Sequence, residues 1–187
     1  MRIIACVLSA AILLAVPALA KDMPRPVVDH GGTRFVFDMR LASGLAWKQM
    51  NGEGHWGYPV DALALFRIDI GGTGNTIMPE LGYSGSLHFD ADIQSHYFVG
   101  GVGYGFSSEW FTAGIVPSIV AGVTQDFDGN RGDGLGVRAT LFAEVPRIVG
   151  VQMTYQSVAS GGVLEHQVMF TASLNAALIV VWALLAR

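Results

Sequence analysis

One polar segment, 126–134, contains residues whose spacing resembles that of metal ligands. Asp126, Asp128 and Asn130 have the spacing of the first side-chain ligands of a calcium loop. Arg131 stands where that loop requires glycine, and Val137 stands where it requires a closing acidic ligand. The segment is therefore predicted to be a solvated turn, and we expect no metal ion there.

The other candidate cofactor and metal groups are scattered along the chain. The series Gly101-x-Gly103-x-Gly105 is not the dinucleotide fingerprint, because no helix pattern follows it. The histidines lack the short, regular spacings of metal ligands. We therefore predict no metal and no cofactor. The histidines are His30, His55, His88, His96 and His166.

Serine and histidine occur together twice, at Ser95 beside His96 and at Ser160 with His166. Such a pair could supply the nucleophile and the base of an esterase that acts on lipid. Neither pair has an orienting acid at a recognisable spacing. The sequence therefore predicts that the protein is not an enzyme, and a lipid-modifying esterase is the alternative.

The stretch 34–48 indicates which kind of element positions these side chains. Its odd-numbered residues are apolar apart from Ser43, and its even-numbered residues carry every charge. A period of two is the mark of a β-strand with two unlike faces. Such a strand is long enough to cross a bilayer, because ~10 tilted residues span the hydrocarbon.

Seven further stretches alternate in the same way, and past residue 20 no apolar run reaches the ~18 residues that a membrane-spanning helix needs. The fold class predicted is all-β, an eight-stranded antiparallel up-and-down transmembrane β-barrel over residues 34–187. Longer connections are predicted in the first, third, fifth and seventh gaps, including 51–58 and 126–134, as in barrels with long external loops. The predicted strands are 34–48, 60–70, 77–90, 96–106, 111–124, 135–145, 149–157 and 166–174.

Residues 1–20 have the pattern of a secretory signal peptide. Arg2 precedes an apolar stretch over 3–16, and Ala18-Leu19-Ala20 is a small-x-small cleavage site. Residues 21–33, with two prolines, are predicted to form a polar periplasmic leader. The only cysteine, Cys6, lies inside the signal, so the mature chain can form no disulfide. The net charge of −4 leaves nothing basic enough to bind nucleic acid.

The polar faces of the strands carry acids and bases in comparable number. In a closed eight-stranded barrel these side chains point inward and just fill the space. Because an unpaired buried charge is costly, we predict a lumen plugged by ion pairs. A narrow pore along the same groups is the alternative. The predicted network comprises Asp38, Arg40, Arg67, Asp69, Glu80, Arg138 and Glu144.

Aromatic residues gather near the ends of the predicted strands on the apolar face. Two girdles of aromatic side chains are typical of a barrel that crosses both interfaces of a membrane. The external girdle is predicted to contain Trp47, Trp56, Tyr58 and Phe89, and the periplasmic girdle Phe35, Phe106, Trp110 and Phe111.

A signal peptide followed by eight amphipathic strands resembles the small eight-stranded outer-membrane barrels of the OmpA-transmembrane and opacity-protein class. The resemblance implies the outer membrane of a Gram-negative cell envelope, a periplasmic N-terminus, contact with outer-membrane lipid, and insertion by the barrel-assembly machinery. One feature departs from the class. Such barrels usually end on an aromatic residue, whereas 176–187 is an apolar tail with Trp182 as its nearest aromatic.

The function predicted is a structural or surface-interaction role in the outer membrane, with no surface ligand identified. Besides the narrow pore, two alternatives remain. One is a lipid A-modifying outer-membrane enzyme that uses the serine and histidine residues. The other is a soluble lipocalin-like barrel with its faces inverted. The face containing Gly101, Gly114 and Gly122 would make a poor outer surface for that barrel, and this favours the membrane.

Overall fold

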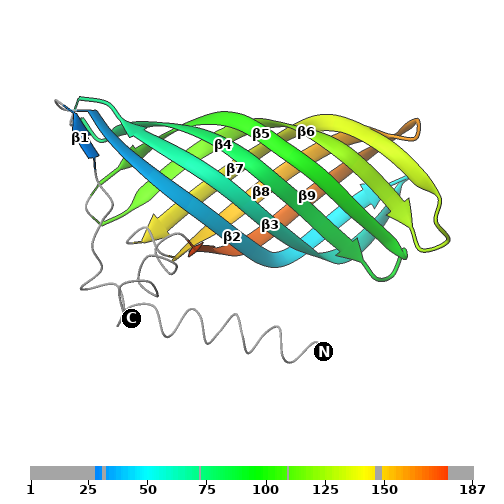
Figure 1. Cartoon of the computed structure of the whole chain (residues 1–187). Helices are drawn as coiled ribbons and strands as arrows, with labels where there is room; N and C mark the ends of the chain where they lie inside the picture. Colours follow the sequence, from blue (N-terminus) through cyan, green and yellow to red (C-terminus); the bar gives the residue numbers. More distant parts are fainter. Residues whose placement is uncertain (1–27, 31–32, 72, 109, 146–148, 177–187) are drawn as a thin grey trace, which may run out of the picture.

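The computed structural model of the chain is built from β-strands joined by short connections (Figure 1). The structure describes residues 28–30, 33–71, 73–108, 110–145 and 149–176. Within these ranges the strands are β1 (Val28–His30), β2 (Thr33–Met50), β3 (Glu53–Asp69), β4 (Asn75–His88), β5 (Ile93–Ser107), β6 (Thr112–Asp126), β7 (Arg131–Val145), β8 (Val149–Ser160) and β9 (Val163–Asn175).

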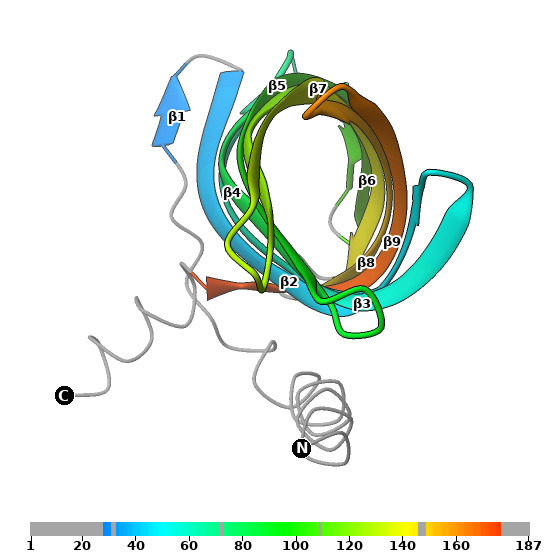
Figure 2. The same cartoon turned by 90° about the vertical axis from the view of Figure 1, so that its right-hand side faces the viewer.

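Each strand pairs antiparallel with its neighbours in sequence, and β2 also pairs with β9. This last pairing closes β2 to β9 into a ring, which Figure 2 shows nearly end-on. The predicted all-β fold, an eight-stranded antiparallel up-and-down barrel, is confirmed. Strand β1 pairs only with the beginning of β2 and lies outside the ring.

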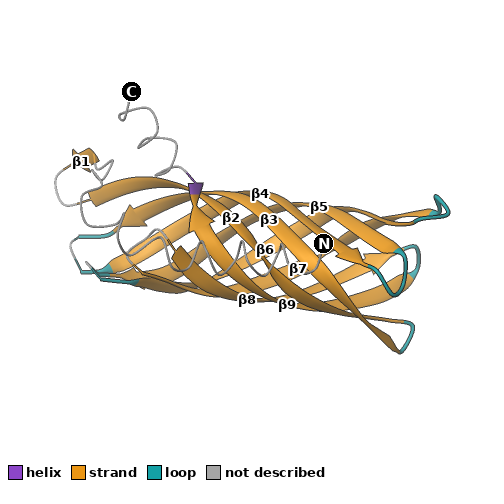
Figure 3. Cartoon of the chain, turned by 90° about the horizontal axis from the view of Figure 1, so that it is seen from below, coloured by secondary structure: helices purple, strands orange, loops and turns teal. Residues whose placement is uncertain are grey.

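The connections lie at the two ends of the barrel, as the loops of Figure 3 show. We call the end that carries β1 and the last residues of β9 the terminal end, and the opposite end the distal end. The distal connections are 51–52, 89–92, 127–130 and 161–162, and the terminal ones are 70–74, 108–111 and 146–148. The predicted alternation of long and short connections is therefore wrong.

The difference arises because the strands continue into segments whose composition predicts loops. Residues 53–58 belong to β3, and the turn before them consists of Asn51 and Gly52, with φ of 54° and 84°. Two residues with positive φ suffice for a hairpin whose twist matches that of its strands. Gly54 then lies against the indole of Trp47, which leaves no room for a larger side chain. Residues 131–134 likewise belong to β7.

Part of the predicted leader 21–33 is also strand. Val28–His30 forms β1 and pairs with the beginning of β2, with Val28 opposite Phe35. The predicted signal peptide, the remainder of the leader before residue 28, and residues 177–187 of the apolar tail lie outside the described residues.

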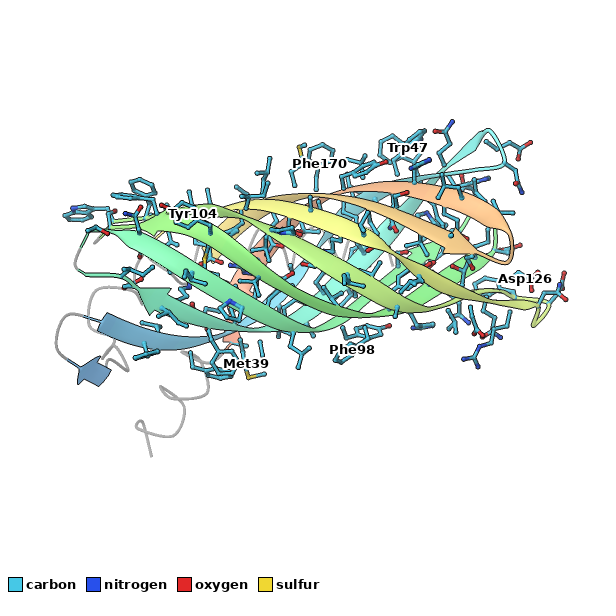
Figure 4. The ribbon with its side chains drawn as sticks, turned by 90° about the horizontal axis from the view of Figure 1, so that it is seen from above. Met39, Trp47, Phe98, Tyr104, Asp126 and Phe170 are labelled. Carbon is cyan, nitrogen blue, oxygen red and sulfur yellow. The ribbon has the colours of Figure 1, made fainter. Side chains whose placement is uncertain are left out.

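Alternation along the strands divides the side chains between the two faces of the barrel. In β2, Phe37 is 44% exposed while the adjacent Asp38 is 4% exposed, and Leu41 is exposed while Arg40 is buried. Figure 4 shows Met39, Phe98 and Phe170 directed away from the barrel. The apolar face is therefore outside and the charged face inside, because successive side chains of a strand point to opposite sides.

The interior also contains apolar side chains, which pack between the charged groups. Leu63, Leu65, Tyr97, Val99, Val120 and Val158 form one buried cluster, and Met78, Val116 and Phe142 form another. The opening seen along the barrel axis in Figure 2 is therefore occupied by side chains.

Candidate functional site

Two ion pairs join opposite walls of the barrel. Strands β3 and β7 are four apart in the ring of eight, so they face each other across the lumen. Arg138 of β7 holds Asp61 of β3 with both terminal nitrogens, at 2.5 and 3.3 Å. Arg67 of β3 binds Glu144 of β7. In each strand the two charged residues are six positions apart. The acid comes first in β3 and the base comes first in β7, so the two ion pairs connect the opposite walls at two levels along the barrel axis.

A network at the terminal end includes the second of these pairs. We call Asp38, Arg40, Arg67, Glu144 and Asn175 the terminal network. Arg67 binds Asp38 through Nε and Glu144 through Nη2, and Arg40 binds the other oxygen of Glu144. Asn175 donates its amide to Asp38. One glutamate therefore balances parts of two buried guanidinium groups.

Phe142 provides a further contact for the terminal network. The guanidinium carbon of Arg40 lies 4.4 Å from the centroid of the Phe142 ring. At that distance a cation is attracted by the face of an aromatic ring. Arg40 is therefore held between a carboxylate and an apolar wall.

A separate network lies at the distal end. We call Lys48, Ser95, Tyr97, Thr124 and Glu165 the distal network. Lys48 Nζ lies 2.7 Å from Glu165 Oε2 and donates to Ser95 Oγ at 2.9 Å. Thr124 and Tyr97 donate their hydroxyls to the same Glu165 oxygen at 3.2 and 3.3 Å. Here a single ion pair is surrounded by hydroxyl groups.

Glu80 belongs to neither network. Its Oε1 accepts a hydrogen bond from Ser118 at 2.5 Å, and the side chain is buried, with 3% of the residue exposed. Its Oε2 has no hydrogen-bond partner among the described residues. Glu80 is thus a buried carboxylate of the lumen that forms no ion pair within 4.0 Å with a described residue.

The structure brings together only part of the predicted lumen set. Asp38, Arg40, Arg67 and Glu144 meet in the terminal network, while Arg138 pairs with a residue outside the set.

The two remaining members stand apart. Glu80 lies inside, where it accepts a hydrogen bond from Ser118. Asp69 is half-buried near the end of β3 and accepts a hydrogen bond from Thr76 at 2.7 Å.

Three charged residues of the lumen were missing from the predicted set. Lys48 has the same parity in β2 as Arg40, and Asp61 has the same parity in β3 as Arg67, so the period of two already placed both on the inner face. Glu165 falls outside the predicted set because the sequence predicts that the last strand begins at residue 166, whereas β9 begins at Val163.

The predicted girdle residues that are exposed lie at both ends of the barrel. Phe35, Phe106, Trp110 and Phe111 are exposed at the terminal end, where the rings of Phe106 and Phe111 are 5.9 Å apart. At the distal end Trp56, Tyr58 and Phe89 are exposed, whereas Trp47 is half-buried against Gly54. Figure 4 shows Trp47 toward one end of the molecule and Tyr104 toward the other.

The calcium-like segment is a turn that closes on itself. Asn130 donates its backbone N–H and its side-chain amide to the Asp126 carboxylate, both at 2.8 Å. These bonds from Asn130, the side-chain one first, lower the pKa of Asp126. Among the described residues, no three His, Cys, Asp or Glu side chains are grouped as a metal site requires.

The two serine–histidine combinations do not form nucleophile–base pairs. Ser95 is buried in the lumen while His96 is exposed on the outer surface, because neighbouring residues of a strand point to opposite faces. Ser160 donates to the carbonyl of Gly132, and His166 contacts Tyr155 instead.

Comparison with known proteins adds no family. No protein-family model matches the chain, and a search of curated proteins found no match. In the part of the chain that the structure describes, no helix is long and apolar enough to cross a membrane.

Proposed function

We propose that the protein is an outer-membrane β-barrel of the small eight-stranded class, with a structural or surface-interaction role and a lumen closed by ion pairs. The observation that carries this proposal is the inside-out distribution of its side chains. Large apolar residues such as Leu41, Phe98 and Phe170 cover the outer face, while buried charges fill the inner one. Contiguous apolar surface of this kind is costly in water and matches a hydrocarbon environment.

The same distribution argues against the soluble lipocalin-like alternative. That alternative requires the apolar set inside, where a ligand would bind, and the charged set in water. Here Arg40, Arg67 and Arg138 are buried and paired inside. Partition of the untagged protein into the soluble fraction would contradict the membrane assignment.

We place the terminal end in the periplasm. The start of β2 and the end of β9 both lie at this end, because the ring contains an even number of antiparallel strands. A chain exported behind a signal peptide and inserted from the periplasm leaves both ends on that side. The lengths of the connections do not support this orientation, since the distal connections are as short as the terminal ones.

The test combines membrane insertion with a pair of variants at one outward position. The folded barrel should migrate differently in electrophoresis before and after boiling, with a β-type circular dichroism spectrum. Leu41→Arg should lower the free energy of unfolding in lipid vesicles by ~2–4 kcal/mol, as for arginine near a bilayer midplane. Leu41→Ala should cost much less, because lipid fills the space that the side chain leaves. A neutral Leu41→Arg would mean that this face does not contact lipid.

A narrow pore is a second candidate, favoured by one wall of the lumen. Gln152 and Gln156 of β8 and Thr171 and Ser173 of β9 are buried, yet each has side-chain atoms with no hydrogen-bond partner among the described residues. Buried polar atoms without protein partners are usually bonded to water. Ionic conductance across planar bilayers that contain the protein would support the pore, and absence of conductance would favour the plugged lumen.

A further inference from the structure

Two tyrosine–histidine pairs on the outer surface repeat the same geometry. The Tyr83 hydroxyl lies 2.6 Å from His96 Nδ1, and the Tyr155 hydroxyl lies 2.8 Å from His166 Nδ1. The ring centroids of the two pairs are 6.0 and 6.1 Å apart. Neither pair belongs to the lumen networks. Both pairs place polar groups that can form hydrogen bonds on an outer surface that is otherwise largely apolar.

The pairs also share one register. His96 is opposite Gly85 and His166 is opposite Ser157, so each histidine meets the tyrosine two positions earlier on the neighbouring strand. A small residue at the opposite position leaves room for the tyrosine ring, and a Cβ added at Gly85 would clash with it. The repeated arrangement therefore depends on three residues in each pair of strands.

Both pairs lie equally far along their strands from the distal end, on opposite sides of the barrel. His96 is the fourth residue of β5 and His166 the fourth residue of β9, and both strands begin at the distal end. β4 and β5 are four positions from β8 and β9 in the ring of eight. If the barrel spans a membrane, the two imidazoles face the lipid near one interface, in the zone where amphipathic rings gather.

The direction of each tyrosine–histidine hydrogen bond depends on which nitrogen of the imidazole carries the proton, and this sets what the ring can offer to a partner. When the hydroxyl donates to Nδ1, the neutral ring carries its proton on Nε2. No described residue accepts a hydrogen bond from Nε2 of His96 or His166. A donor without a partner in an apolar environment is unfavourable, so its partner should be an acceptor that the membrane supplies. Among lipid groups at an interface, the phosphate oxygens are the anionic acceptors, and they form the stronger, charge-assisted bonds.

We propose that His96 with Tyr83, and His166 with Tyr155, form two binding sites for the phosphate of lipid headgroups, one on each side of the barrel. Each Nε2–H donates to a phosphate oxygen, and the two sites together fix the depth of the barrel in the outer leaflet. This inference rests on the proposed membrane location, and it adds a ligand chemistry that the location alone does not specify.

The test is direct contact between histidine nitrogen and lipid phosphorus. Protein labelled with ¹⁵N in its histidine rings is reconstituted in phosphatidylglycerol and phosphatidylcholine bilayers, and ¹⁵N–³¹P dipolar dephasing is recorded by solid-state NMR. We expect dephasing of Nε2 signals that disappear in the His96→Phe, His166→Phe double variant. The single variants His96→Gln and His166→Gln should each remove one of the two signals. His88 is the matched control, because it is buried in the lumen and should show no dephasing.

A second arm distinguishes lipid phosphate from free phosphate. In phosphate-free galactolipid bilayers with inorganic phosphate in the buffer, we expect no dephasing, and a signal there would overturn the headgroup assignment. Absence of dephasing in phospholipid bilayers would overturn the two sites, provided that the heat-dependent electrophoretic shift of the same sample shows that the barrel is inserted. A sample that does not insert would overturn both the sites and the proposed function.

Discussion

The terminal and distal networks stabilise the same lumen in different ways. In the terminal network, Arg40 and Arg67 share Glu144, and Arg67 also binds Asp38. One terminal nitrogen of each arginine, Nη1, has no partner among the described residues. Each charge there depends mainly on the charges beside it.

The distal network contains fewer charges and more hydroxyl groups. Lys48 and Glu165 form its only ion pair among the described residues, and each also bonds to a hydroxyl, Lys48 to Ser95 and Glu165 to Tyr97 and Thr124. Loss of one charge would leave the other with neutral partners. The comparison indicates that deleting one charged side chain should lower the free energy of unfolding more in the terminal network than in the distal network.

The largest effect is expected for Glu144→Ala. Among the described residues, the change leaves Arg40 and Arg67 with Asp38 as their remaining ion-pair acid. Breaking a buried pair by removing one partner costs ~3–5 kcal/mol. Urea unfolding of the reconstituted protein in vesicles measures the difference. Glu165→Ala is the matched control, because it deletes the equivalent carboxylate of the distal network. Equal losses for the two variants would remove the distinction between the networks.

The ion pair between Asp61 of β3 and Arg138 of β7 offers a test of whether a buried pair adds stability or only avoids the cost of an unpaired buried charge. Arg138→Met alone should cost ~3–5 kcal/mol, because Asp61 is then buried without a partner. The double variant Asp61→Leu, Arg138→Met should lie close to the wild type, since both desolvation costs disappear together. Unfolding free energies of the two singles and the double form a complete cycle. A double variant as unstable as the singles would mean that the pair itself contributes the stability.

A smaller effect is expected for Lys48→Met at the distal end. Glu165 keeps the hydroxyls of Tyr97 and Thr124, so the loss should approach that of one hydrogen bond to a charged group, ~1.5–3 kcal/mol. The same urea unfolding measures it, and Lys48→Arg should restore most of the stability. A loss as large as that of Glu144→Ala would show that the hydroxyls do not support the carboxylate.

The faces of the strands could be predicted from the sequence, but the partners inside could not. Parity alone assigns Asp38, Arg40 and Lys48 to one face of β2, since the period of two is local. The pairing of Asp61 with Arg138 joins residues far apart in the chain, and it depends on the closure and stagger of the barrel. Neither quantity is encoded in the pattern of a single strand.

The connections were mispredicted for a related reason. Glycine-rich segments such as 51–58 resemble loops by composition, although glycine in a barrel strand also serves close packing. Gly54 under Trp47, and Gly85 beside Tyr83, are required by neighbouring aromatic rings rather than by turns. Composition does not distinguish the two uses, because the ring that requires the space lies elsewhere in the sequence.

The smallest effect is expected for Glu80→Gln, which lies outside both networks. The amide oxygen can still accept the hydrogen bond from Ser118, and the other atom of the group has no partner to lose among the described residues. The variant forfeits a longer-range attraction to Arg138 and is relieved of a buried charge, two effects of opposite sign. We therefore expect a change in unfolding free energy within ~1 kcal/mol, about the net contribution of one hydrogen bond. Glu80→Ala, which also removes the bond to Ser118, is the control and should cost more. A large loss in Glu80→Gln would mean that its charge stabilises Arg138 as strongly as a direct ion pair, and that the lumen holds a third network between the other two.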